Sequence, residues 1–307
     1  MEQNILLIGS KGFLGSHVKI LLEKQDQLFT EIKGKSEVDI TNLESFKDYV
    51  AGKNITSIIN CAAFVGGISF GYKYQADLLK INSLMATNLY DVANSFGIKN
   101  IINPISNCAY PGNLTVYNEK EFWDGPPHES VFNYALSKRL FVALGKSFYE
   151  QYGISSYNVV LSNMYGPGDH FEEERSHALG ALIKKIYLAK ISNNNSIDIW
   201  GTGRPIREWL FVEDGAKGLV KSLKLNEGNY LYNVGINKGS SIIEIAELIS
   251  KHMDWNGEFN LNTDMPDGVM RKTVNGDLGG KILNWNPEVK LNDGIKKTVE
   301  WYVNNNE

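Results

Sequence analysis

Cysteine is scarce in this sequence, which holds only Cys61 and Cys108 among its 307 residues. Two cysteines provide neither a disulfide framework nor the clustered ligands of a metal-binding motif. The sequence therefore predicts no metal site.

An excess of positive charge is also missing. The 31 lysine and arginine residues are outnumbered by 35 acidic residues, and the formal net charge is −4. Proteins that bind nucleic acid broadly leave a basic footprint, so this balance argues against nucleic acid as a partner.

Long apolar runs are absent as well. No stretch approaches the ~20 residues that a membrane span needs, and no charged-then-apolar leader with a cleavage site begins the sequence. We expect no membrane association and a cytoplasmic location.

What is present is the composition of an ordinary soluble globular protein, with 43% hydrophobic and 21% charged residues. A chain of 307 residues is large for one core and comfortable for two domains.

Short apolar segments alternate along the chain with longer segments of helical character. This alternation predicts an α/β fold with a doubly wound parallel sheet of the Rossmann-like kind, covered by helices on both faces. The expected strands are residues 4–8, 57–60, 100–105, 156–161 and 230–234, and the expected helices are residues 16–22, 76–96 and 133–152.

Two interleaved domains are expected. Residues 1–165 would form a dinucleotide-binding domain. Beyond residue 165 glycine, proline and asparagine become more frequent, which predicts a smaller, mainly substrate-binding domain over residues 166–307. The late strand at 230–234 indicates a segment near 206–237 that returns to the first domain.

A glycine-rich turn follows the first expected strand. Gly9, Gly12 and Gly15 lie between this strand and a helix, in the order that a dinucleotide fingerprint requires. Gly9 permits a tight turn, Gly12 lets the backbone approach a pyrophosphate, and Gly15 lets helix and strand pack closely. The spacing is GxxGxxG instead of GxGxxG, and a glycine turn without a ligand is the alternative.

Tyr134 and Lys138 are four residues apart on the expected helix at 133–152, so they share one face. A nearby ammonium favours phenolate and lowers a tyrosine pKa that starts near ~10, which gives a proton donor usable near neutral pH. In isolation such a pair is more often a surface contact.

Ser106, Cys108 and Asn163 lie just beyond the expected strands at 100–105 and 156–161. Ligands of such sheets bind beyond the carboxyl ends of the strands. Taken alone, Cys108 would more often be a small buried hydrophobe, and His177 a surface or capping residue.

The sequence resembles an extended short-chain dehydrogenase/reductase, and within that group the GDP-L-fucose synthase family. The glycine turn and the Tyr134–Lys138 pair support only the larger group. The narrower resemblance rests on blocks that follow the family's order and span most of the chain: residues 65–68 (VGGI), 106–111 (SNCAYP), 125–130 (GPPHES), 162–169 (SNMYGPGD), 176–177 (SH), 200–208 (WGTGRPIRE) and 266–272 (PDGVMRK).

In that family one active site inverts C3 and C5 of a GDP-4-keto-6-deoxymannose and then reduces C4 with NADPH. The resemblance therefore implies Cys108 and His177 as the epimerisation pair, with Cys108 favoured as the base. It implies Ser106, Tyr134 and Lys138 as the reduction apparatus. A thiol with a pKa of ~8.5 and an imidazole with a pKa of ~6.5 bracket neutral pH, which suits proton transfer.

NADP(H) is the expected cofactor, with NAD(H) not excluded. Lys33 and Lys35 stand about where the family places basic residues, and Lys11 adds a cation in the turn. Glu31, in contrast, stands near the distance at which a carboxylate selects NAD. The resemblance implies further cofactor contacts from Gly9, Gly12, Phe13, Leu14, Gly15, Asp39, Ile40, Ala62, Tyr134, Lys138 and Asn163.

A GDP-linked keto-deoxy sugar is the implied substrate. Lys185 stands where the family often has arginine, and Lys184 competes with it for the pyrophosphate. Trp200 would equally suit plain core packing. The implied substrate contacts are Val65, Gly66, Asn163, Lys185, Trp200, Arg207 and Asp267.

The sequence differs from the family at two positions, Phe64 and Met265, where the family commonly has lysine. The identity of the sugar substrate is therefore left open. Relatives with a similar acid/base pair act on other GDP-4-keto sugars, including dideoxy and heptose forms, and some reduce C4 without epimerising. A nucleotide-sugar 4-epimerase or dehydratase is less favoured, and so is a non-catalytic scaffold or redox sensor. The two long helices would pair across a two-fold axis, as in the family, which predicts a homodimer.

Overall fold

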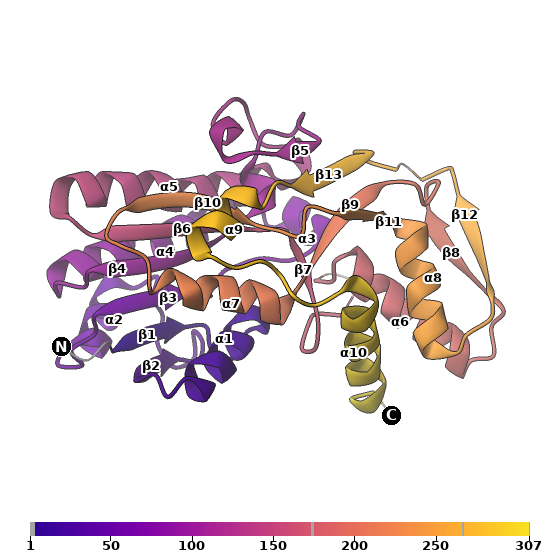
Figure 1. Ribbon diagram of the computed structural model, residues 1–307, viewed down its shortest axis with the longest axis horizontal. Coiled ribbons are helices and arrows are strands. Elements are labelled where there is room, and N and C mark those ends of the chain that lie inside the picture. Colours follow the sequence, from indigo (N-terminus) through magenta and orange to yellow (C-terminus); the bar gives the residue numbers. More distant parts are fainter. Residues whose placement is uncertain (1–3, 173–174, 266, 307) are drawn as a thin grey trace.

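A six-stranded parallel sheet forms the larger lobe of the computed structural model, which describes residues 4–172, 175–265 and 267–306 (Figure 1). The strands follow the order β10–β6–β4–β3–β1–β2, and every neighbouring pair is parallel. They are β1 (Ile5–Ile8), β2 (Phe29–Ile32), β3 (Ser57–Asn60), β4 (Asn100–Ser106), β6 (Ser155–Leu161) and β10 (Asn229–Val234). The predicted α/β doubly wound sheet is confirmed.

Helices cover both faces of this sheet (Figure 1). One face carries α1 (Phe13–Lys24) and α7 (Val212–Ser222), and the other carries α2 (Leu43–Val50), α4 (Gln75–Ser95) and α5 (Phe132–Tyr152). Successive side chains of a strand point to opposite faces. Accordingly Leu6 and Ile8 join one core, whereas Ile5 and Leu7 join the other. A strand buried on both sides reads as a continuous apolar run, which is why residues 4–8 were recognisable.

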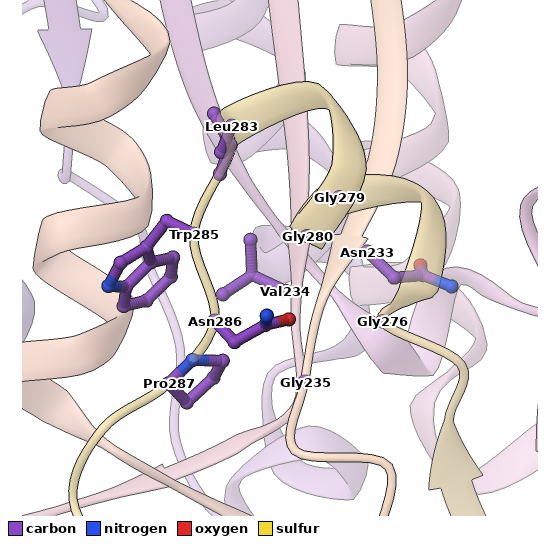
Figure 2. A pocket seen from close by; sticks show the side chains of 10 residues that line it. All are labelled: Asn233, Val234, Gly235, Gly276, Gly279, Gly280, Leu283, Trp285, Asn286 and Pro287. Carbon is purple, nitrogen blue, oxygen red and sulfur yellow. The ribbon is translucent and has the colours of Figure 1, made fainter.

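The edge strand β10 returns from late in the chain and pairs with β6. Helix α9 (Asp277–Leu283) packs against it through glycine, because a Cβ at Gly279 would lie 1.9 Å from the carbonyl oxygen of Asn233. Figure 2 shows Gly279 and Gly280 of α9 beside the end of β10. The crevice between α9 and β10 is too narrow to hold a water molecule.

A second lobe has its own core, formed by α6 (Ala178–Ile191), α8 (Ile242–Met253) and α10 (Leu291–Asn304) with β8 (Ser196–Trp200) and β12 (Glu258–Asn262). A five-stranded sheet runs between the lobes in the order β11–β9–β13–β5, with β7 also pairing with β9. Its members are β5 (Val116–Tyr117), β7 (Asn163–Tyr165), β9 (Ile206–Phe211), β11 (Gly239–Ser241) and β13 (Arg271–Val274). The domain boundary at residue 165 stays a prediction.

Short helices complete the chain: α3 (Ile68–Lys73) and the 3₁₀ turns η1 (Asn107–Ala109), η2 (Glu119–Glu121) and η3 (Glu129–Val131). Within the described ranges, no helix combines the length and the apolar character needed to cross a membrane.

Candidate active site

The glycine turn joins β1 to α1 and is built around close backbone contacts. Gly9 has a φ of +80°, and a Cβ at Gly15 would lie 2.0 Å from the carbonyl oxygen of Gly9. Gly12 is the N-cap of α1 and offers no side-chain cap. The first N–H groups of α1, which begins with Phe13 and Leu14, are therefore left for a ligand, and an anion such as a pyrophosphate fits them.

Positive charge surrounds the end of β2. Lys19 Nζ lies 3.1 Å from Glu31 Oε1, and Lys33 Nζ lies 3.8 Å from the same oxygen. The Ser10 hydroxyl, together with these two ammonium groups, holds the pKa of Glu31 below its usual value. Because the carboxylate is already compensated and Lys33 directly follows the strand, this end of the sheet favours a ribose that carries a phosphate.

Other expected cofactor residues lie around the same turn. Asp39 accepts hydrogen bonds from the backbone N–H and the hydroxyl of Thr41, at 3.0 and 2.6 Å, and pairs with Lys35 at 3.2 Å. A Cβ at Gly9 would lie 2.9 Å from the backbone nitrogen of Ala62. Ile40 is buried in the core beside them, and Lys11 is exposed.

One cavity of about 350 Å³ brings most of the expected catalytic residues together. It opens where β4 and β6 end and where β7 and α6 begin. The expected residues that line it are Ser106, Cys108, Tyr134, Asn163, His177, Arg207, Val65 and Gly66. Six separate segments of the chain therefore converge on one space.

Several of these side chains lie at the end of an element. Ser106 is the last residue of β4, and its Oγ accepts a hydrogen bond from the backbone N–H of Cys108 at 3.3 Å. Asn107 donates through Nδ2 to Asn163 Oδ1 at 3.4 Å. His177 is the N-cap of α6, without a side-chain cap bond, so its imidazole is free for the cavity.

Lys138 is buried beneath Tyr134 and does not line the cavity. Its Nζ donates to the carbonyl oxygen of Pro104 at 3.0 Å and lies 5.6 Å from the centre of the Tyr134 ring. Burial lowers the pKa of Lys138 to about 8.

The expected lowering of the Tyr134 pKa is wrong for this structure. Burial, with a smaller effect of Cys108, raises the pKa of the Tyr134 phenol. Desolvation of the phenolate outweighs the attraction of an ammonium that is directed at a backbone carbonyl. Tyr134 consequently keeps its proton near neutral pH, as a proton donor must.

Burial acts on the other pair in opposite directions. It raises the pKa of the Cys108 thiol, against the effects of Ser106, Lys138 and Lys272. It lowers the pKa of His177, and His170 adds to that shift. The resting pair is a neutral thiol and a neutral imidazole, which runs against a resting thiolate base.

Two cations close one side of the cavity. Arg207 on β9 and Lys272 on β13 are register partners, and both line the space. Buried Glu208 accepts hydrogen bonds from the backbone N–H groups of Ile236 at 2.6 Å and Val274 at 2.8 Å, which ties β9 to β13. A guanidinium beside an ammonium suits a diphosphate.

Lys272, Asn107, Tyr117 and Trp209 also line the cavity and were missed by sequence reasoning. Lys272 stands in the block 266–272, but only its pairing with β9 brings it to the site. Pro266, at the start of that block, lies outside the described residues.

Lys185, Trp200 and Asp267 do not line this cavity, and neither does Lys184. Lys185 Nζ donates to the carbonyl oxygen of Asp198 at 3.2 Å and lies 5.9 Å from the Trp200 ring. Trp200 is 63% exposed, so core packing is excluded for it. Asp267 accepts from the backbone N–H and hydroxyl of Thr202, at 2.6 and 2.8 Å, and so fixes the loop after β8.

The departure at Phe64 has a structural counterpart. Its ring lies 5.1 Å from that of Phe70 and 6.2 Å from that of Tyr74. This cluster holds α3, which contributes Tyr72 to the cavity wall. Among the described residues no group of histidine, cysteine and acidic side chains is arranged to hold a metal ion.

A parallel doubly wound sheet, an uncapped glycine turn and a serine–tyrosine–lysine set at the strand ends define the class of dinucleotide-binding α/β proteins. Within that class, the chain belongs to the NAD dependent epimerase/dehydratase family, whose sequence profile matches residues 5–235.

Three known proteins narrow the comparison. The chain is 31% identical over 304 residues to a putative GDP-L-fucose synthase 2 from Arabidopsis thaliana, covering 98% of this chain and 92% of the relative. A GDP-L-fucose synthetase from Naegleria fowleri, solved with NADP bound, is 26% identical with a TM-score of 0.90, covering 99% and 93% of the two chains. A GDP-mannoheptose C4 reductase from Campylobacter jejuni, also with NADP bound, shares the fold at 23% identity, with a TM-score of 0.87 and 98% of both chains covered.

Proposed function

We propose that this chain is an NADPH-dependent epimerase/reductase that converts a GDP-4-keto-6-deoxymannose-type sugar to GDP-L-fucose or a close analogue. The observation that carries the proposal is that Ser106, Cys108, Tyr134 and His177 line one cavity. The similarity to GDP-L-fucose synthases over almost the whole chain supports it.

Epimerisation would use Cys108 and His177. A ketone at C4 acidifies the protons on C3 and C5, so a carbon-bound proton can leave to a base and return from an acid on the other face, through an enolate. Both groups are neutral at rest, because the pKa of the Cys108 thiol is raised and that of His177 is lowered. Lys138 and Lys272 stabilise the thiolate whenever Cys108 gives up its proton.

Reduction would use Ser106 and Tyr134. When bound, NADPH would supply the hydride for C4. Tyr134 would donate its proton to the C4 oxygen, and the Ser106 hydroxyl would hydrogen-bond the same oxygen as negative charge develops on it. Lys138 would stabilise the developing phenolate from below the ring.

The cofactor would lie along the glycine turn. Gly9, Gly12 and Gly15 allow the close approach of its pyrophosphate, and Lys33 with Lys11 would hold the 2′-phosphate. Asp39, Ile40, Ala62 and Asn163 would contact the rest of it.

The nucleotide of the substrate would extend towards the second lobe. Arg207 and Lys272 would bind the diphosphate. The exposed Trp200 ring, with Lys185 above it, offers a stacking surface for the base. Asp267 would act through the Thr202 loop.

The alternative is a C4 reductase for another GDP-4-keto sugar, such as a heptose or dideoxyhexose. The Phe64–Phe70–Tyr74 cluster favours it, because an aromatic ring replaces the lysine that the family commonly has beside the sugar.

The test is to incubate the purified protein with GDP-4-keto-6-deoxymannose and NADPH in D₂O and to identify the sugar by NMR. We expect GDP-fucose that carries deuterium at C3 and C5. The Tyr134→Phe variant should lose roughly 10²–10⁴-fold in ketone reduction while solvent deuterium still enters the sugar.

Tyr152 lies on the same helix but does not line the cavity, so Tyr152→Phe is the matched control and should reduce the ketone at the rate of the unmodified protein. Reduction without deuterium would identify a plain C4 reductase. Failure to oxidise NADPH with this sugar would move the search to heptose and dideoxy substrates.

The proposal extends to a homodimer paired through α4 and α5 and to the cytoplasm. The two free thiols, Cys61 and Cys108, are consistent with a reducing compartment.

A further inference from the structure

Arg139 directly follows Lys138 on α5 and is buried, with 9% of its surface exposed. Its guanidinium carbon lies 5.6 Å from the ring centre of Phe122 and 5.6 Å from that of Trp123. Both rings belong to the excursion between β4 and α5. A planar cation suits this position between aromatic faces.

The guanidinium reaches the segment that carries Cys108. Arg139 Nε donates to the carbonyl oxygen of Ala109 at 2.7 Å. On the other side, the backbone N–H of Cys108 is held by Ser106 Oγ at 3.3 Å. The turn η1 is therefore fixed at both ends, to β4 through Ser106 and to α5 through Arg139.

Burying the Arg139 guanidinium costs free energy, so stabilisation of the fold alone does not account for its position. Arg139 Nη2 is buried without a hydrogen-bond partner among the described residues, and a buried charge that lacks full hydrogen bonding is costly. Burial lowers the pKa of the Arg139 guanidinium and Cys108 opposes that shift, so the two groups lie within electrostatic range.

We propose that Arg139 is a positioning residue that fixes Cys108 relative to Tyr134 and Lys138 on the same helix. The residue proposed for proton transfer at carbon and the residues proposed for ketone reduction are then held in fixed positions relative to α5. The inference rests on the proposed function, because it assigns Cys108 to proton transfer.

The first arm of the test measures, without substrate, how firmly the hydrogen bond from Arg139 to Ala109 holds the turn η1. Backbone amide exchange of the purified full-length protein is followed by mass spectrometry in a peptide that covers residues 106–110. The Arg139→Gln variant should exchange there roughly tenfold faster, because a charged donor to Ala109 is lost. Arg139→Lys should restore much of the protection, since lysine keeps a charged donor.

The matched control is Lys296→Gln, which removes one positive charge from the exposed Lys296–Glu300 pair on α10. It should leave exchange in residues 106–110 unchanged. Unchanged exchange in that peptide of Arg139→Gln would overturn the proposal, whatever the enzymatic result.

The second arm measures the ratio of deuterium incorporated at sugar carbon to ketone reduced, in the D₂O assay above. Misplacing Cys108 should lower this ratio by roughly ten- to a hundredfold in Arg139→Gln, with partial recovery in Arg139→Lys. A general packing defect would lower both activities together and contradict the positioning role. If Arg139→Gln does not fold, Arg139→Lys decides, because lysine cannot place its donor where the Arg139 Nε lies. An intermediate loss of both the amide protection in residues 106–110 and the deuterium-to-reduction ratio would support the proposal. Values equal to those of the unmodified protein would contradict it.

If the unmodified protein incorporates no deuterium, the proposed function fails. The amide-exchange arm still decides whether Arg139 holds residues 106–110 in place.

Discussion

Asp169 is a carboxylic acid in surroundings that disfavour its charge. Burial raises its pKa from 3.8 to about 7, with a smaller contribution from Glu172, against the hydrogen bond donated by the His170 backbone. Between about pH 4 and pH 7 the folded chain keeps this proton while the unfolded chain releases it. Stability from this group is therefore present below about pH 4 and is lost as the pH rises towards 7.

Asp169→Asn removes this titration and keeps an acceptor for the His170 N–H, which lies 2.7 Å away. Above pH 7 we expect the variant to have a higher free energy of unfolding, by at most about 4 kcal/mol, and therefore a higher melting temperature. Below about pH 4 we expect no gain in stability. Thermal melts at the two pH values measure the difference. An equal gain at both would mean that charge is not the cause.

Individual residues were only partly predictable from the sequence. Ser106, Cys108 and Asn163 could be placed because strand ends meet at one edge of a parallel sheet. The sign of the Tyr134 pKa shift could not, because it depends on how deeply the phenol is buried. Lys272 escaped notice because its site neighbour Arg207 is remote in sequence.

At the scale of elements, the β1–α1 turn gives a sharp test. A Cβ at Gly15 would meet the backbone of Gly9 at 2.0 Å, and backbone cannot rotate away as a side chain can. Gly15→Ala should cost roughly 1–3 kcal/mol of stability and weaken NADPH binding, as measured by thermal melts and fluorescence titration.

The control is Gly125→Ala, where the nearest atom to an added Cβ is a Pro111 side-chain carbon at 3.6 Å. It should leave both quantities close to those of the unmodified protein. Normal NADPH affinity in Gly15→Ala would contradict the role assigned to the turn.

Five of the six strands of the large sheet, and helices α1, α4 and α5, were predicted with ends that shift by a few residues, because apolar runs and helical segments are local signals. Strand β2 and helices α2 and α7 were not predicted. The small strands were not predicted either. β5 pairs with β13, and β8 pairs with β12, so each pair joins segments far apart in the chain. A two-residue strand such as β5 has no periodicity from which it could be recognised.

For the whole molecule, the exposed faces of α4 and α5 carry the assembly prediction. Leu84 on α4 and Tyr149 and Tyr152 on α5 are large side chains that are 39%, 36% and 45% exposed. Two helices packed side by side, with such residues outward, suit a second copy of the chain. Sedimentation at micromolar concentration should give a dimer, and Leu84→Glu should give a folded monomer.

Leu278 on α9 is exposed to a similar degree, 41%, and Leu278→Glu is the matched control that should stay dimeric. A monomeric unmodified protein at the same concentration would refute the dimer.

The late return of β10 has a consequence for synthesis on the ribosome. Strand β6 ends at Leu161, but its outer neighbour begins only at Asn229. Until that segment emerges, at ~5–20 residues per second, the nascent sheet presents a row of unsatisfied backbone groups that can recruit another chain. A transcript truncated within this interval would therefore yield an aggregating fragment, and chaperone contact is most needed during these seconds of translation.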